Sequence, residues 1–150
     1  AKLEAYGIRG NLLKWMEAFL TGRSQRVVIK GVLSESLPVW SGVPQGSVLG
    51  PLLFLIFIND LLDEVDSSGS LFADDSKLFR KINCPHDQLT LQNDLAKLQD
   101  WSRKWLLEFN EKKCKVMHIG RLNLKHDYHI NNTVLVETKE EKRLGCVYYT

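Results

Sequence analysis

The sequence has little of several features that would each define a class of protein. Its 150 residues include only three cysteines and four prolines. No run of apolar residues reaches the ~18 that a membrane-spanning helix needs. The net charge is only +2, so there is no general basic signal of a free-standing nucleic-acid module, and any basic surface must be local. With 44% hydrophobic and 25% charged residues, the composition is that of a folded domain.

The cysteines and histidines do not have the spacing of a metal site. Cys84, Cys114 and Cys146 are odd in number and far apart, so we interpret them as reduced thiols. His126 and His129 lie three residues apart without a nearby cysteine pair, and we interpret them as surface side chains rather than zinc ligands.

Basic residues gather in two segments of the chain. They are plausible phosphate contacts, and the alternative is that they are ordinary solvated side chains. The first group is Arg9, Lys14, Arg23, Arg26 and Lys30, and the second is Arg103, Lys104, Lys112, Lys113 and Lys115.

Two adjacent carboxylates, Asp74 and Asp75, lie between the apolar segments 71–73 and 77–79, where the chain should turn back on itself. A two-residue hairpin turn of the favoured type needs positive φ at both positions, and Asn-Gly or Asp-Gly is expected there. Asp-Asp supplies no glycine and adds repulsion between like charges. A bound Mg²⁺ would offset this repulsion, because carboxylates are among its preferred ligands. The alternative is a solvated acidic turn.

Residues 41–51 combine three glycines and two prolines just before a long apolar run. This pattern predicts a shaped loop that opens a helix, with Pro51 at the first helical position and unpaired amides able to face a phosphate. Gln45 lies between Pro44, whose φ is fixed, and Gly46, whose backbone is permissive, and so would be presented close to a ligand. The alternative is a plain capped helix start.

Apolar spacing predicts the remaining elements. Helices are expected over 11–20 and 52–62, and from Pro85 to Asn110, where the helix should cover a sheet. Strand-like segments 25–30 and 35–39 should form a hairpin through 31–34, and later strands are expected over 114–119, 128–130, 134–136 and 144–149. This order predicts one α+β domain over residues 1–150.

Several of these segments together resemble the reverse transcriptases of non-LTR retrotransposons, which are LINE-type and here jockey-like. The segments are Val43–Pro51, the helix ending with Phe57–Leu61, Leu71–Asp75, Trp105–Gly120 and Lys142–Cys146. The last of these resembles the primer-grip hairpin of that family. The resemblance covers essentially the whole chain.

The resemblance implies a partial polymerase palm of the right-hand reverse transcriptase fold, an antiparallel sheet covered by helices. It implies an RNA-directed DNA polymerase, a nucleotidyltransferase that uses two Mg²⁺ ions. Its partners would be an RNA template, a DNA primer and deoxynucleoside triphosphates, together with the rest of the polymerase: the upstream palm and fingers, the thumb and an endonuclease. No membrane association is implied, and the nucleus or cytoplasm is the expected location.

The resemblance also gives roles to single residues. Asp74 and Asp75 are implied to be catalytic and to bind the metal ions, and Gln45 and Gly46 to lie against the incoming nucleotide. Lys113 aligns with a lysine near the triphosphate and is a candidate proton donor to the leaving group, with a solvated lysine as the alternative.

The primer grip would involve Leu144 and Gly145, which position the primer end through backbone contacts. Cys146 follows them where the family usually has a small aliphatic residue, which leaves the hairpin plausible.

The family's catalytic centre requires a further aspartate on a strand just upstream of the segment that resembles residues 3–8. We expect this chain to start too late to contain it, and Asp60, Asp63 and Asp66 follow the long helix and cannot replace it. We therefore expect the 150 residues not to polymerise DNA unaided, and the loss of a strand to make them poorly soluble.

Two alternatives to this polymerase remain. One is a non-catalytic RNA-binding remnant of a decayed mobile element. The other is a cellular relative such as an intron maturase or a telomerase-type enzyme, although Val43–Pro51 and Lys142–Cys146 are closer to the LINE-type group.

Overall fold

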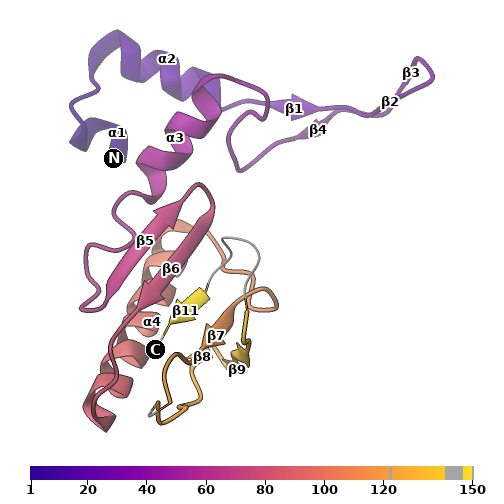
Figure 1. Cartoon of the computed structure of the whole chain (residues 1–150). Coiled ribbons are helices and arrows are strands. Elements are labelled where there is room, and N and C mark those ends of the chain that lie inside the picture. Colours follow the sequence, from indigo (N-terminus) through magenta and orange to yellow (C-terminus); the bar gives the residue numbers. More distant parts are fainter. Residues whose placement is uncertain (122, 141–146, 150) are drawn as a thin grey trace. The chain divides into compact units, whose positions relative to one another are not determined.

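The computed structural model describes residues 1–121, 123–140 and 147–149, and the chain divides into two compact units, residues 1–59 and 60–150 (Figure 1). The elements follow the predicted order of helix, hairpin, helix, hairpin, helix and short strands, preceded by one further short helix. The α+β class is thus confirmed. A single domain over residues 1–150 stays a prediction.

The unit formed by residues 1–59 contains three helices and a long hairpin. The helices are α1 (Lys2–Ala5), α2 (Gly10–Leu20) and α3 (Leu49–Ile58), and the strands are β1 (Ser24–Gln25), β2 (Val28–Ile29), β3 (Val32–Leu33) and β4 (Leu37–Pro38). β1 pairs with β4 and β2 with β3, both antiparallel. The turn residues Lys30 and Gly31 have φ of +49° and +81°, as a type I′ turn requires. The predicted hairpin is confirmed, with a tighter turn than expected.

The core of this unit is small. Met16 of α2 and Leu53 and Ile58 of α3 are buried. Because α3 is apolar on every side, Leu52 and Leu55 remain half exposed. Large apolar side chains are also exposed along the β2–β3 end of the hairpin.

The unit formed by residues 60–150 places one long helix against a sheet that has five strands among the described residues. The helix is α4 (Pro85–Trp105), and the strand order is β10 (Val136–Glu137), β7 (Lys115–Met117), β11 (Val147–Tyr149), β6 (Asp75–Phe79) and β5 (Ser68–Phe72). β8 (His129–Ile130) and β9 (Thr133–Val134) form a separate antiparallel pair. Leu91, Leu95 and Leu98 of α4 pack with Leu78 of β6 and Val116 of β7. The predicted helix covering a sheet is confirmed.

The sheet is mixed rather than antiparallel. β5 and β6 form an antiparallel hairpin, but β6 with β11, β11 with β7 and β7 with β10 are parallel pairs. The prediction of an antiparallel sheet is therefore wrong for three of the four pairings. Strands that run in the same direction need a long crossover connection, and residues 80–114, which contain α4, supply it between β6 and β7.

α4 begins with Pro85, as predicted, but it ends at Trp105 and not at residue 110. Leu106 adopts a left-handed conformation with φ of +55°, and the Ser102 hydroxyl donates a hydrogen bond to the Leu107 carbonyl at 2.6 Å. Without a glycine at this end, the sequence gives no local signal for the stop. None of the helices in the described residues is long and apolar enough to cross a bilayer.

Candidate active site

The acidic pair lies at the tip of the β5–β6 hairpin. Phe72 pairs with Asp75, so the turn consists of Ala73 and Asp74, one residue earlier than the Asp-Asp turn that the sequence predicts. Asp74 is exposed, and Asp75 is half-buried as the first residue of β6. The positive φ, +53°, falls on Ala73, so the backbone strain belongs to the alanine and not to the aspartates.

Alternation along β6 separates the two faces of the sheet. Ser76 and Leu78 are buried on the side of the core, whereas Asp75, Lys77 and Phe79 lie on the opposite face. Val116 of β7 is likewise in the core, which places its neighbours on the opposite face. We call this surface the open face, and its residues are Asp75, Lys77, Phe79, Lys115 and Met117.

Lys113 lies at the same edge of the sheet as Asp75. It is exposed and precedes Lys115 of β7 by two residues, just as Asp75 precedes Lys77 of β6 by two residues. Lys77 and Lys115 are both register partners of Val147, on either side of β11. The starts of β6 and β7 therefore lie at the same edge of the sheet, and Lys113 is in the hydrogen-bonded turn that leads into β7.

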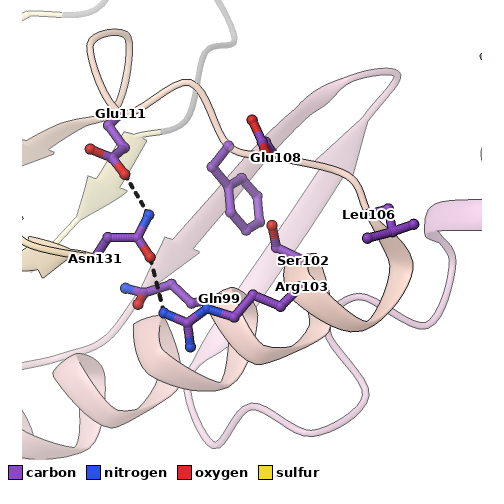
Figure 2. A pocket seen from close by; sticks show the side chains of 8 residues that line it. Gln99, Ser102, Arg103, Leu106, Glu108, Glu111 and Asn131 are labelled. Atoms are coloured by element: carbon purple, nitrogen blue, oxygen red, sulfur yellow. Dashed lines mark hydrogen bonds between the residues drawn. The ribbon is translucent and has the colours of Figure 1, made fainter. Parts of the chain in front are cut away.

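A side-chain network fastens the turn that carries Lys113. The Glu111 carboxylate accepts a hydrogen bond from the Asn131 amide, and Arg103 donates to the Asn131 oxygen at 3.2 Å (Figure 2). The same carboxylate also accepts a hydrogen bond from the Thr133 hydroxyl. The hydrogen bonds from Thr133 and Asn131 hold the pKa of Glu111 below its usual value. This network fixes the backbone two residues before Lys113.

A recess of about 460 Å³ lies beside this network (Figure 2). Its walls combine a guanidinium, two carboxylates and an aromatic ring. All but Asn131 come from residues 99–111, where the helix ends and the chain turns back, and the sequence analysis missed the recess because it extended the helix to residue 110. The lining residues are Gln99, Ser102, Arg103, Leu106, Glu108, Phe109, Glu111 and Asn131.

Asp94 of α4 holds the start of the hairpin that carries Asp74. Its side chain is fully buried, and its carboxylate accepts hydrogen bonds from the N–H groups of Asp66 at 2.9 Å and Ser67 at 2.8 Å. The Lys97 ammonium lies 3.3 Å from the same carboxylate. Burial raises the pKa of Asp94, but the hydrogen bonds to Ser67, Asp66 and Lys97 outweigh burial and lower the pKa overall. Sequence analysis did not identify this clamp.

Gln45 and Gly46 form the middle of a tight turn in residues 1–59. The N–H and the hydroxyl of Ser47 both donate to the Pro44 carbonyl, at 3.4 and 2.6 Å. Gly46 has φ of +78°, which fits the third position of a type II turn. The Gln45 side chain is exposed, as a residue that meets a ligand should be.

The same loop sets the start of α3. The helix begins at Leu49, so Pro51 is its third residue and not its first, as the sequence predicts. The Gly50 N–H already donates to the Ser47 hydroxyl at 3.0 Å. A Cβ at Gly50 would lie 2.9 Å from the Pro44 carbonyl oxygen, so this close approach requires glycine.

The predicted site residues thus fall into separate groups. The acidic pair and Lys113 share one edge of the sheet in residues 60–150, and the 45–46 turn belongs to residues 1–59. Leu144 and Gly145, the predicted primer grip, lie outside the described residues. No cluster of three or more His, Cys, Asp or Glu in the described part of the chain could hold a metal alone. Two carboxylates nevertheless fit Mg²⁺, which commonly completes its coordination with substrate phosphates and water.

Two of the predicted phosphate contacts already bind groups of the protein. Arg23 donates to backbone carbonyls, and Arg103 donates to two side chains of its own unit. Cys84 and Cys114 are free thiols, as predicted, and Cys146 lies outside the described residues.

Neighbouring carboxylates are ligands that divalent cations use in sites of phosphoryl transfer. Residues 1–148 match the family described as Reverse transcriptase (RNA-dependent DNA polymerase). The chain therefore belongs to the reverse transcriptase family.

The relatives of this chain come from mobile elements. The RNA-directed DNA polymerase from mobile element jockey of Drosophila funebris is 32% identical over 146 residues, which cover 91% of this chain and 16% of the relative. Its Drosophila melanogaster counterpart is 33% identical over 108 residues, 66% of this chain and 12% of the relative. The probable RNA-directed DNA polymerase from transposon X-element of Drosophila melanogaster is 34% identical over 104 residues, 65% of this chain and 12% of the relative. No solved structure matches the chain.

The chain spans 16% or less of the length of these relatives. The predicted resemblance to jockey-like reverse transcriptases is confirmed.

Proposed function

We propose that the chain forms part of the palm of a retrotransposon RNA-directed DNA polymerase and takes part in nucleotidyl transfer. Its substrates would be deoxynucleoside triphosphates, an RNA template and a DNA primer. The observation that carries this proposal is that Asp75 and the turn bearing Lys113 lie at the same edge of the sheet, in a chain that matches the reverse transcriptase family.

Asp74 and Asp75 are the metal-binding carboxylates of this proposal. Mg²⁺ bound there would activate the attacking primer hydroxyl and neutralise charge on the triphosphate. Asp74 is exposed in the turn and Asp75 is the first residue of β6, so both carboxylates belong to the same edge of the sheet. Lys113, in the turn at the same edge of the sheet, could donate a proton to the departing pyrophosphate.

The remaining roles are assigned by resemblance. Gln45 and Gly46 would lie against the incoming nucleotide, and the type II turn supports this role because it presents backbone and side chain together at an exposed tip. Leu144 and Gly145 would position the primer end.

Binding of a divalent cation to the 150-residue chain tests the central part of the proposal. Mn²⁺, used as a paramagnetic probe at millimolar concentration, should broaden the backbone amide signals of residues 72–76, and Mg²⁺ should reverse the effect by competition. Asp74→Ala should abolish the broadening. Asp63→Ala, which removes an exposed carboxylate outside the hairpin, should preserve it.

Equal broadening in wild type and Asp74→Ala would contradict metal binding by the acidic pair. RNA binding that is unaffected by Mg²⁺ and by Asp74→Ala would instead favour the RNA-binding remnant. We also propose that the 150 residues do not extend a primer unaided, because the proposal assigns only Asp74 and Asp75 to the metal ions and two ions need further ligands. Primer extension by the purified chain, lost in Asp74→Ala, would contradict this.

A further inference from the structure

Arg23 joins the end of α2 to the loop that precedes Gln45. Its Nε donates to the Leu20 carbonyl at 2.8 Å, and its Nη2 donates to the Gly42 carbonyl at 2.5 Å and the Ser41 carbonyl at 3.4 Å. The Leu20 carbonyl is at the last residue of α2, where no helical partner remains. The Arg23 guanidinium therefore supplies a donor to the last carbonyl of α2. It also holds two carbonyls of the loop that follows the hairpin, although Arg23 itself precedes the hairpin.

The two ends of the loop are fixed in different ways. At one end, the Arg23 guanidinium holds the Gly42 carbonyl, and Gly42 has φ of +77°, a conformation that favours glycine. At the other end, Ser47 closes the turn onto Pro44 and caps α3 through the Gly50 N–H. Between these anchors, the chain has only Val43 before the turn begins.

This arrangement leaves little freedom for Gln45. Pro44 has a fixed φ, and Gly46 is held in the left-handed region by the closed turn. A lysine at position 23 could not replace the planar guanidinium, because it cannot direct donors to three carbonyls in fixed directions.

We propose that Arg23 is a positioning residue for the Gln45–Gly46 turn, and so for the nucleotide contact assigned to that turn. Only the second part of this inference, the effect on nucleotide binding, rests on the proposed function. Arg23 was predicted to be a candidate phosphate contact. In the structure, its Nε and Nη2 instead donate hydrogen bonds to backbone carbonyls of the protein and so hold the loop.

Amide hydrogen exchange of the whole 150-residue chain tests the structural half. Arg23→Lys keeps the positive charge but removes the planar guanidinium with its fixed donor directions. We expect amide exchange at residues 42–47 to become at least about tenfold faster, because hydrogen bonds to charged groups are stronger than those between neutral groups. Residues 91–98 of α4 should be unaffected. Arg121→Lys, an exposed arginine outside this loop, is the matched control and should change neither segment. Unchanged exchange at 42–47 in Arg23→Lys would overturn the inference.

A double-mutant cycle with dATP and Mg²⁺ tests the functional half. If Arg23 acts through the turn, Arg23→Lys should weaken dATP binding in the wild-type background and have no further effect in Gln45→Ala. An equal loss in both backgrounds would overturn positioning, because Arg23 would then contact the nucleotide independently.

If the wild-type chain binds no dATP, the proposed nucleotide contact fails, and hydrogen exchange still decides whether Arg23 holds the loop. If Arg23→Lys does not fold, Gly50→Ala provides a second test, since it strains the same loop from its other anchor. It should accelerate exchange at 42–47, and unchanged exchange would count against a rigid loop.

Discussion

Replacement of Asp94 by alanine should strongly destabilise the unit that carries the acidic pair. The buried carboxylate accepts hydrogen bonds from the N–H groups of Asp66 and Ser67, and hydrogen bonds to ionised groups contribute about 1.5–3 kcal/mol each. Part of this loss of stability is offset, because the variant does not bury a charged carboxylate and because alanine has a higher helix propensity than aspartate. We therefore expect the free energy of unfolding to fall by about 3 kcal/mol and the melting temperature by about 10 °C. Urea and thermal denaturation measure both.

Asp100→Ala is the control on the same helix. Its carboxylate is exposed and pairs with Arg103 at 3.0 Å, so its removal should cost no more than about 0.5 kcal/mol. If Asp94→Ala were as mild as this control, the proposed clamp would not exist.

The pH dependence of Asp94→Asn gives a second check. Since the folded-state pKa of Asp94 lies below its ordinary value of 3.8, the charged carboxylate stabilises the fold above that pH. This stabilisation is lost as the pH falls through the folded-state pKa. The stability difference between wild type and Asp94→Asn should therefore narrow in acid, and a difference that stays constant from neutral to acid pH would refute the argument.

Three further substitutions have defined outcomes. Gly50→Ala should lower the free energy of unfolding by about 1–3 kcal/mol, because its Cβ would press on the Pro44 carbonyl; an unchanged urea midpoint would contradict this. Ala73→Gly should raise stability by about 1 kcal/mol, because glycine accepts φ of +53° without strain, and a lower melting temperature would count against a strained turn. Tyr128→Phe should change stability by less than about 0.5 kcal/mol, because the buried hydroxyl has no hydrogen-bond partner among the described residues. Burial, with Asp87 nearby, raises the pKa of Tyr128 to about 12, so ultraviolet titration should show one fewer late-titrating tyrosine in the variant.

Elements with strong local signals were predictable from the sequence. The apolar spacing of residues 11–20 predicts α2, and the proline at position 85 predicts the start of α4. The structure confirms both predictions. The hairpin of residues 25–39 is confirmed, although its turn lies at Lys30-Gly31 and not at the predicted residues 31–34. In each case, the decisive interactions lie within a few residues of one another.

Features that depend on contacts distant in the sequence were not predictable. Asp94 contacts Asp66 and Ser67 across more than twenty residues, and nothing near Asp94 distinguishes it from a surface aspartate of a helix. Arg23 was interpreted as a phosphate contact because its sequence context is basic, whereas two of its three carbonyl partners, those of Ser41 and Gly42, lie beyond the whole hairpin. The position of the acidic turn was missed by one residue because the last ladder pair, Phe72 with Asp75, is set by the register of the entire hairpin.

The parallel direction of the sheet matters for the proposed chemistry, although the sequence analysis predicted the opposite. β6 and β7 both begin at one edge, on either side of β11, and this places the turn that carries Lys113 at the same edge as Asp75. If β7 ran in the other direction from the same register at Lys77, the turn that carries Lys113 would lie toward the Phe79 end of β6, which is four residues or ~13 Å from Asp75. A proton donor at that end could not serve a phosphate held at the acidic pair. The pairing direction, and not the presence of the two residues in the sequence, therefore makes the proposed role of Lys113 geometrically possible.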